Sequence, residues 1–105
     1  MENKTYCFDI DGVIATLVDN LDYTKASPKY EIIDAVNTLY DQGHTIILFT
    51  ARGSVSGIDW EDVTKDQMEA WGVKYHQLLF GKPAADFYVD DKMISLVDLI
   101  KQVGR

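Results

Sequence analysis

The chain has 105 residues, of which 47% are hydrophobic and 26% are charged, and this composition indicates one folded domain over residues 1–105 and excludes a disordered chain. Its formal net charge of −7 argues against a nucleic-acid or anionic-membrane partner, because proteins neutralise those phosphate groups with Lys and Arg. An acidic chain can still bind a phosphate ester if it supplies a local cation.

Signals for a cellular compartment are few. The N-terminal residues lack the layout of a signal peptide, and no apolar run approaches the roughly 20 residues that a membrane-spanning helix needs. The single cysteine, Cys7, excludes an internal disulfide framework and fits a reducing environment. We therefore expect a cytoplasmic protein without a membrane partner.

The first half of the chain predicts two strands separated by a helix. Residues 5–8 form a short apolar strand, and residues 13–26 are expected to form a loop or small hairpin. The serine-proline pair at 27–28 has the N-cap and first-turn chemistry of a helix start, and Gly43 ends the helix that follows. Residues 45–49 are a β-branched apolar run typical of a buried parallel strand.

The second half of the chain predicts two further helices and two short strands. A glycine- and serine-rich loop covers 52–57 and leads to a helix over 60–71. Strands are expected at 77–80 and 87–89. A last helix over 95–103 opens with a capping box.

Alternating strands and helices in this order predict a single Rossmann-like α/β domain with a parallel sheet of about four to five strands and helices on both faces. Ligands of such sheets bind at the carboxyl ends of the strands. Polar residues follow the successive strands: Asp9 and Asp11, then Thr50, then Lys82, then Asp90 and Asp91. We expect these side chains to converge on one edge of the sheet.

A cluster of carboxylates at one edge needs a cation, and oxygen-only ligands favour Mg²⁺. A carboxylate can attack phosphorus to give an aspartyl-phosphate, and a second carboxyl two residues further on can protonate the leaving alcohol and later activate water. Lys82 and the Thr50 hydroxyl are suited to stabilise charge on the phosphoryl oxygens. The edge of the sheet therefore predicts a phosphoryl-transfer site.

Four sequence motifs occur in order over roughly residues 5–100: Asp9-x-Asp11-Gly12-Val13, a hydrophobic strand ending in Thr50, Gly81-Lys82-Pro83, and Tyr88-Val89-Asp90-Asp91. Together they resemble the motifs of the haloacid dehalogenase superfamily. A single pair of aspartates is common by chance, whereas four motifs in this order, each after a predicted strand, are specific.

The resemblance implies a role for each motif residue. Asp9 would be the nucleophile and a metal ligand, and Asp11 would be the general acid/base with its backbone carbonyl on Mg²⁺. Thr50 and the Ala51 amide would hold the phosphoryl group, and Lys82 would pair with it. The second acid at Asp11 resembles the phosphatase branch, because dehalogenases lack it.

The resemblance also assigns the last acidic pair and the arginine after the second strand. Asp91 would coordinate the metal directly, and Asp90 would act either through water or as a direct ligand. The Thr50-Ala51-Arg52 sequence resembles polynucleotide phosphatases and small capless sugar phosphatases. Arg52 would then either contact substrate beyond its phosphate or form a structural ion pair.

Short spacings between the motifs leave no room for a cap domain, after either the first or the second motif. Capless members resemble enzymes that act on large substrates or that cover the site by oligomerising, as sugar-acid phosphatases of lipopolysaccharide synthesis do. The net charge favours a small phosphorylated sugar, polyol or related metabolite over nucleic acid. We therefore expect a small-metabolite phosphatase that forms a homo-oligomer.

Three other functions compete with this interpretation. A polynucleotide 3′-phosphatase module would want a basic groove, and a phosphomutase normally needs a cap. A phospho-acceptor receiver domain also clusters acids, a Thr or Ser and a Lys around Mg²⁺. In receivers, however, the adjacent acidic pair comes first and the phosphorylated Asp lies mid-chain, whereas here the pair at 90–91 comes last.

Overall fold

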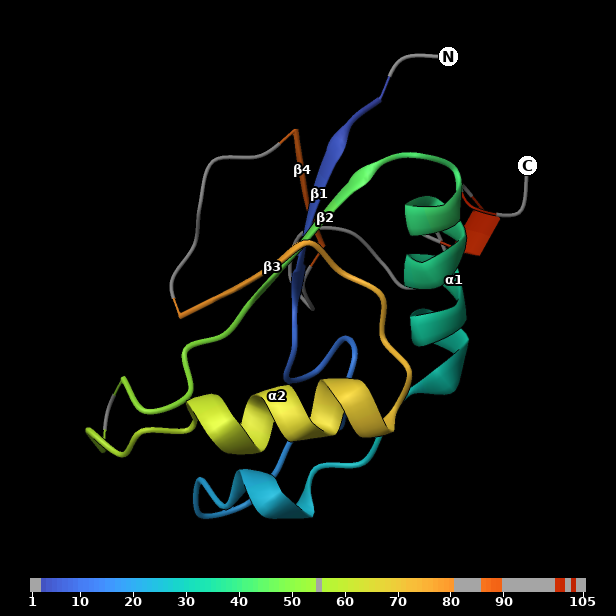
Figure 1. The fold of residues 1–105 in the computed structure, drawn as a ribbon. Helices are drawn as coiled ribbons and strands as arrows, with labels where there is room; N and C mark the ends of the chain where they lie inside the picture. Colours follow the sequence, from blue (N-terminus) through green and yellow to red (C-terminus); the bar gives the residue numbers. More distant parts are fainter. Residues whose placement is uncertain (1–2, 55, 81–85, 90–99, 102, 104–105) are drawn as a thin grey trace.

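The computed structural model describes residues 3–54, 56–80, 86–89, 100–101 and 103. Its elements in chain order are β1 (Thr5–Asp9), the 3-10 helix η1 (Tyr23–Lys25), α1 (Tyr30–Asp41), β2 (Thr45–Phe49), α2 (Glu61–Ala70), β3 (Gln77–Leu79) and β4 (Phe87–Val89). The strands form one sheet in the order β3-β2-β1-β4, and every neighbouring pair is parallel (Figure 1). The predicted α/β class with a parallel sheet is therefore confirmed.

The register of the sheet brings the ends of its strands to one edge. Asp9 at the end of β1 is paired with Phe49 at the end of β2, and Phe49 is paired with Leu79 at the end of β3. The Thr50 N–H donates to the Leu79 carbonyl at 3.1 Å, which continues the ladder beyond β2. Asp9 and Thr50 therefore leave the sheet side by side.

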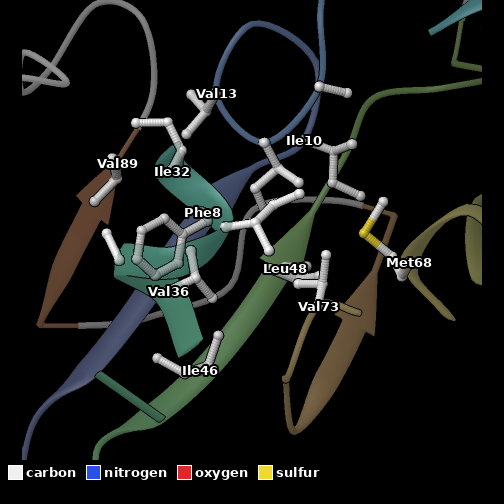
Figure 2. Close-up of a cluster of buried hydrophobic side chains, with 14 of the residues drawn as sticks. Phe8, Ile10, Val13, Ile32, Val36, Ile46, Leu48, Met68, Val73 and Val89 are labelled. Carbon is white, nitrogen blue, oxygen red and sulfur yellow. The ribbon is translucent and has the colours of Figure 1, made fainter. Parts of the chain in front are cut away.

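The main hydrophobic core lies on one face of the sheet. Phe8 and Leu48 project from β1 and β2 into this face, where Val36 of α1 and Met68 of α2 meet them, all four fully buried (Figure 2). This packing follows from the period-2 alternation of each strand and the helical spacing of the apolar residues in α1. It anchors β1, which ends at Asp9, and β2, which Thr50 directly follows.

The opposite face of the sheet carries a smaller cluster. Cys7, Ile47 and Phe49 are buried there, and Leu79 packs against them. Within the described residues, α1, α2 and the C-terminal helical residues all contribute to the first face, so helical cover of this second face stays a prediction. Cys7 is a free cysteine and is buried in this cluster.

The start of α1 differs from the prediction. The serine-proline pair at 27–28 does not begin the helix, which starts at Tyr30 with Lys29 as N-cap and no side-chain cap hydrogen bond. Instead, the Thr16 N–H donates to the Ser27 carbonyl at 2.9 Å, and the Ser27 N–H donates to the Thr16 hydroxyl at 3.0 Å. Pro28 forms an antiparallel bridge with Ala15 in the loop after β1. The serine-proline pair does not cap the helix because this long-range pairing competes with the local cap.

The remaining boundaries lie close to those predicted. β2 and β4 have the expected bounds, whereas α2 is one residue shorter at each end than the predicted 60–71. The last helix was expected over 95–103: residues 100–101 and 103 are helical, and its capping box lies outside the described residues.

No cap domain is evident in the part of the chain that the structure describes. Between Asp11 and α1 lie a loop, its bridges and η1, and between Thr50 and β3 lie loops and α2. The described helices also lack the length and apolar character that crossing a membrane requires.

Candidate active site

A pocket of about 450 Å³ lies at the carboxyl edge of the sheet, in the region where the sequence predicts a site. Its lining residues are Asp9, Phe49, Thr50, Ala51, Arg52, Gly53, Ser54 and Phe80. The lining comes from the end of β1, the end of β2 and the loops that follow β2 and β3. The pocket therefore lies where ligands bind in open parallel sheets.

A tight turn directly after β1 sets the position of the second aspartate. The Ile10 carbonyl accepts the N–H groups of Val13, Ile14 and Ala15 at 3.2, 2.9 and 2.9 Å. Gly12 has φ +91, a left-handed conformation that L residues rarely adopt, and its N–H donates to the Ala15 carbonyl at 2.7 Å. The chain therefore reverses immediately beyond Asp11 and leaves its carboxylate beside the loop after β2.

The Asp11 carboxylate is held by the Arg52 guanidinium in a two-point ion pair. Arg52 Nη2 donates to Asp11 Oδ1 at 2.8 Å, and Arg52 Nε donates to Asp11 Oδ2 at 3.0 Å. The Arg52 side chain has no exposed surface, and the Asp11 side chain is 17% exposed. Such a fork fixes both the distance and the plane of the carboxylate.

Thr50 connects this ion pair to the pocket. Its hydroxyl donates to Asp11 Oδ2 at 3.3 Å and accepts the Arg52 backbone N–H at 3.1 Å. Thr50 is itself buried and lines the pocket beside Asp9. Asp11 is thus one hydrogen bond away from the pocket wall.

The far side of the Arg52 guanidinium is equally enclosed. Arg52 Nη1 donates to Thr64 Oγ1 at 3.0 Å and to Gln67 Oε1 at 2.7 Å, both on α2. The Tyr23 ring of η1 lies 4.7 Å from the guanidinium carbon, a cation–π distance. Gln67 Nε2 also donates to the Tyr23 carbonyl at 2.7 Å, so the loop after β1 and α2 are joined around the arginine.

The structure brings together five of the residues that the sequence singled out. Asp9, Thr50, Ala51 and Arg52 are among the residues that line the pocket, and the Arg52 side chain forms the ion pair with Asp11. Of the two roles left open for Arg52, the structural ion pair is observed. Lys82, Asp90 and Asp91 lie outside the described residues, so their convergence on this edge stays a prediction.

The oxygen donors of this edge fit Mg²⁺ in kind. Asp9 supplies a carboxylate at the pocket. The Asp11 carboxylate is hydrogen-bonded to Arg52 and Thr50, which agrees with the expectation that Asp11 would bind the metal through its backbone carbonyl. Mg²⁺ is commonly bound by one or two carboxylates together with waters and substrate oxygens. Among the described residues no group of three His, Cys, Asp or Glu could hold a metal, and the other expected ligands, Asp90 and Asp91, fall outside them.

Sequence reasoning missed the residues that surround the arginine: Tyr23, Thr64 and Gln67. Thr64 is fully buried on the same side of α2 as Met68, and a polar residue on the apolar face of an amphipathic helix was the available signal. Nothing in the local sequence marks Tyr23, because its contact with Arg52 depends on how the loop folds back.

The same fold occurs in solved structures. No protein-family model matches this chain, and no curated protein sequence matches it significantly. An MCSG target from Vibrio cholerae is similar with a TM-score of 0.72 and 22% identity, over 96% of this chain and 94% of that one. A conserved protein from Bacteroides thetaiotaomicron has a TM-score of 0.71 and 17% identity, over 98% and 91%. A chain of the Pnkp1/Rnl/Hen1 complex has a TM-score of 0.60 and 14% identity, over 94% of this chain and 32% of that one.

The shared feature is the fold. At these identities the likeness extends to the arrangement of strands and helices and not to chemistry. The fold spans nearly the whole length of two of these chains and about a third of the other. The function of this chain therefore depends on its own site residues.

Proposed function

We propose that this chain is a capless member of the haloacid dehalogenase superfamily and a Mg²⁺-dependent phosphomonoester hydrolase acting on a small phosphorylated metabolite. One observation carries the proposal: Asp9 lines a pocket whose wall residue Thr50 is hydrogen-bonded to Asp11. One carboxylate at the pocket and a second one beside its wall are what a two-step phosphoryl transfer needs.

In the first step, an Asp9 carboxylate oxygen attacks phosphorus and forms an aspartyl-phosphate. The bond from phosphorus to the ester oxygen breaks, and its electron pair stays on that oxygen, which takes a proton from the Asp11 carboxyl. The leaving group departs as a neutral alcohol. The Ala51 amide, at the pocket wall, is suited to hold a phosphoryl oxygen during this transfer, and the Thr50 hydroxyl would join it by turning its proton from Asp11 to the phosphoryl group.

In the second step, a water molecule gives a proton to the Asp11 carboxylate and attacks phosphorus. The bond from phosphorus to the Asp9 oxygen breaks, phosphate is released and Asp9 is again a carboxylate. Asp11 ends this step protonated, ready for the next substrate. One residue thus serves as acid and then as base, so its position matters in both steps.

The residues that would hold Mg²⁺ are Asp9, the backbone carbonyl of Asp11, and Asp90 and Asp91. When bound, the ion neutralises negative charge on the phosphoryl group. Lys82 would add a second positive charge there.

The substrate class follows from charge and pocket size. The net charge of −7 disfavours a polyanion, and a pocket of about 450 Å³ suits a small ligand. A phosphorylated sugar or polyol fits both. We also propose that the protein acts in the cytoplasm and that a neighbouring subunit covers the open site.

The test is phosphate release from a panel of phosphorylated sugars, polyols and related metabolites with Mg²⁺ present. Turnover of a small metabolite would support the proposal. Turnover confined to 3′-phosphorylated oligonucleotides would favour a polynucleotide phosphatase instead. Stable phosphorylation by acetyl phosphate without continuing phosphate release would indicate a receiver domain and refute the proposal.

A further inference from the structure

We infer that Arg52 is a positioning residue for the acid/base Asp11 and does not contact the substrate. This inference rests on the proposed function and goes beyond it, because that function gives Asp11 a role and assigns none to Arg52. The observation behind it is the direction in which the guanidinium of Arg52 points: away from solvent, into a set of partners formed by three separate segments of the chain.

The hydrogen bonds of the guanidinium show what it holds. Nε and Nη2 donate to the two oxygens of Asp11, and Nη1 donates to the side chains of Thr64 and Gln67. Each of these nitrogens therefore already has an acceptor within the protein. Arg52 is among the residues that line the pocket, but its side chain has no exposed surface, so the guanidinium cannot reach a sugar hydroxyl or a phosphate unless this network breaks.

The partners of Arg52 keep it in place independently of Asp11. Tyr23 packs over the guanidinium, and Gln67 bonds both to Nη1 and to the Tyr23 carbonyl. Tyr23 is in turn in edge contact with Trp60, with ring centroids 5.1 Å apart. A buried arginine fixed from behind presents a rigid fork to the carboxylate in front of it.

Arg52 also orients the Thr50 hydroxyl, which links Asp11 to the pocket. Its backbone N–H donates to Thr50 Oγ1, and the hydroxyl then donates to Asp11 Oδ2. The same residue thus orients both ends of the contact between Asp11 and the pocket wall. Losing the fork would leave Asp11 free to rotate, and a displacement of about 1 Å at a reacting group can cost about 100-fold in rate.

The test compares two substrates that differ in their need for an acid. An alkyl phosphate needs a proton on its leaving oxygen, whereas para-nitrophenyl phosphate has a good leaving group and needs one far less. For Arg52→Gln we expect kcat/KM on the alkyl phosphate to fall about 10- to 100-fold more than on the aryl phosphate. Arg52→Lys, which keeps the charge but lacks the fork, should behave in the same way.

A double-mutant cycle separates positioning from substrate contact. In an Asp11→Asn background, Arg52→Gln should change kcat/KM on the aryl phosphate by less than about twofold, because the residue through which it acts is gone. The matched control is Lys74→Ala, which removes the cation of an exposed ion pair with Asp41 and should leave kcat/KM unchanged. If Arg52→Gln does not fold, Gln67→Met takes its place, because it removes one acceptor of Arg52 Nη1. It should lower the ratio of kcat/KM on the alkyl phosphate to kcat/KM on the aryl phosphate, by less than the fall expected for Arg52→Gln.

An equal loss on both substrates with a raised KM, or a full additional loss in the Asp11→Asn background, would overturn the inference and make Arg52 a substrate contact. Those outcomes would leave the proposed function intact. A wild-type protein that hydrolyses neither substrate would refute the proposed function itself, together with the inference that rests on it.

Discussion

Arg52 and Asp11 are 41 positions apart in the chain, yet Arg52 Nη2 lies 2.8 Å from Asp11 Oδ1. The pair joins the turn after β1 to the loop after β2, and Thr50 links it to the pocket. Because the strands that lead to both loops are parallel neighbours, the fold itself supplies this contact. The arrangement of the sheet therefore places Arg52 beside Asp11, the residue proposed as the acid/base.

The left-handed Gly12 should be needed for both stability and activity. Gly12→Ala introduces a side chain at φ +91, which costs about 1–2 kcal/mol in the free energy of unfolding and displaces the adjacent Asp11. Denaturant melts and phosphate release would measure the two effects. Gly57→Ala is the matched control, with φ +76 and open space around its Cβ: it should lose similar stability and keep its activity. Full activity in Gly12→Ala would contradict the role given to the turn.

The core beneath the site should tolerate little loss of volume. Leu48→Ala removes a fully buried side chain from β2 and should lower the free energy of unfolding by about 2–5 kcal/mol. Leu17→Ala makes the same chemical change at a residue that is 70% exposed and should alter stability by less than about 0.5 kcal/mol. Equal effects in urea denaturation would mean that the cluster around Leu48 is not the core.

Hydrolysis should depend on a divalent cation. Treatment with EDTA should abolish phosphate release, and added Mg²⁺ should restore it, because charge on the phosphoryl group would otherwise repel the attacking Asp9 carboxylate. Ca²⁺ is the informative comparison, since it binds carboxylate oxygens with looser geometry and longer distances. Undiminished turnover after complete chelation would exclude the metal-dependent mechanism.

Much of the fold could be predicted from local sequence. Residues 45–49 and 87–89 are apolar runs of strand length, and the helical pattern between residues 5–8 and 45–49 predicts parallel pairing of those two strands. The prediction that the helix starts at 27–28 was wrong because the N-cap pattern is local, whereas the bridge between Pro28 and Ala15 joins distant positions. A local rule cannot weigh a contact that forms only after the loop folds back.

The candidate site likewise has features that the local sequence predicts and features that depend on long-range contacts. Asp9 and Thr50 could be predicted to meet because the ends of parallel strands meet at one edge. The role of Arg52 stayed open between substrate contact and ion pair, since the choice depends on the three-dimensional approach of Thr64 and Gln67. Sequence motifs marked the residues of the site, and their mutual orientation required the structure.

The most direct test of the central claim is phosphate release from para-nitrophenyl phosphate by the wild type and by Asp9→Asn, at saturating Mg²⁺. The proposed mechanism predicts steady turnover by the wild type and none above background by Asp9→Asn, because an amide cannot form the aspartyl-phosphate. Asp19→Asn, the same change at an exposed acid of the loop after β1, is the matched control and should match the wild type. Normal turnover by a correctly folded Asp9→Asn protein would remove Asp9 as the nucleophile and contradict the account.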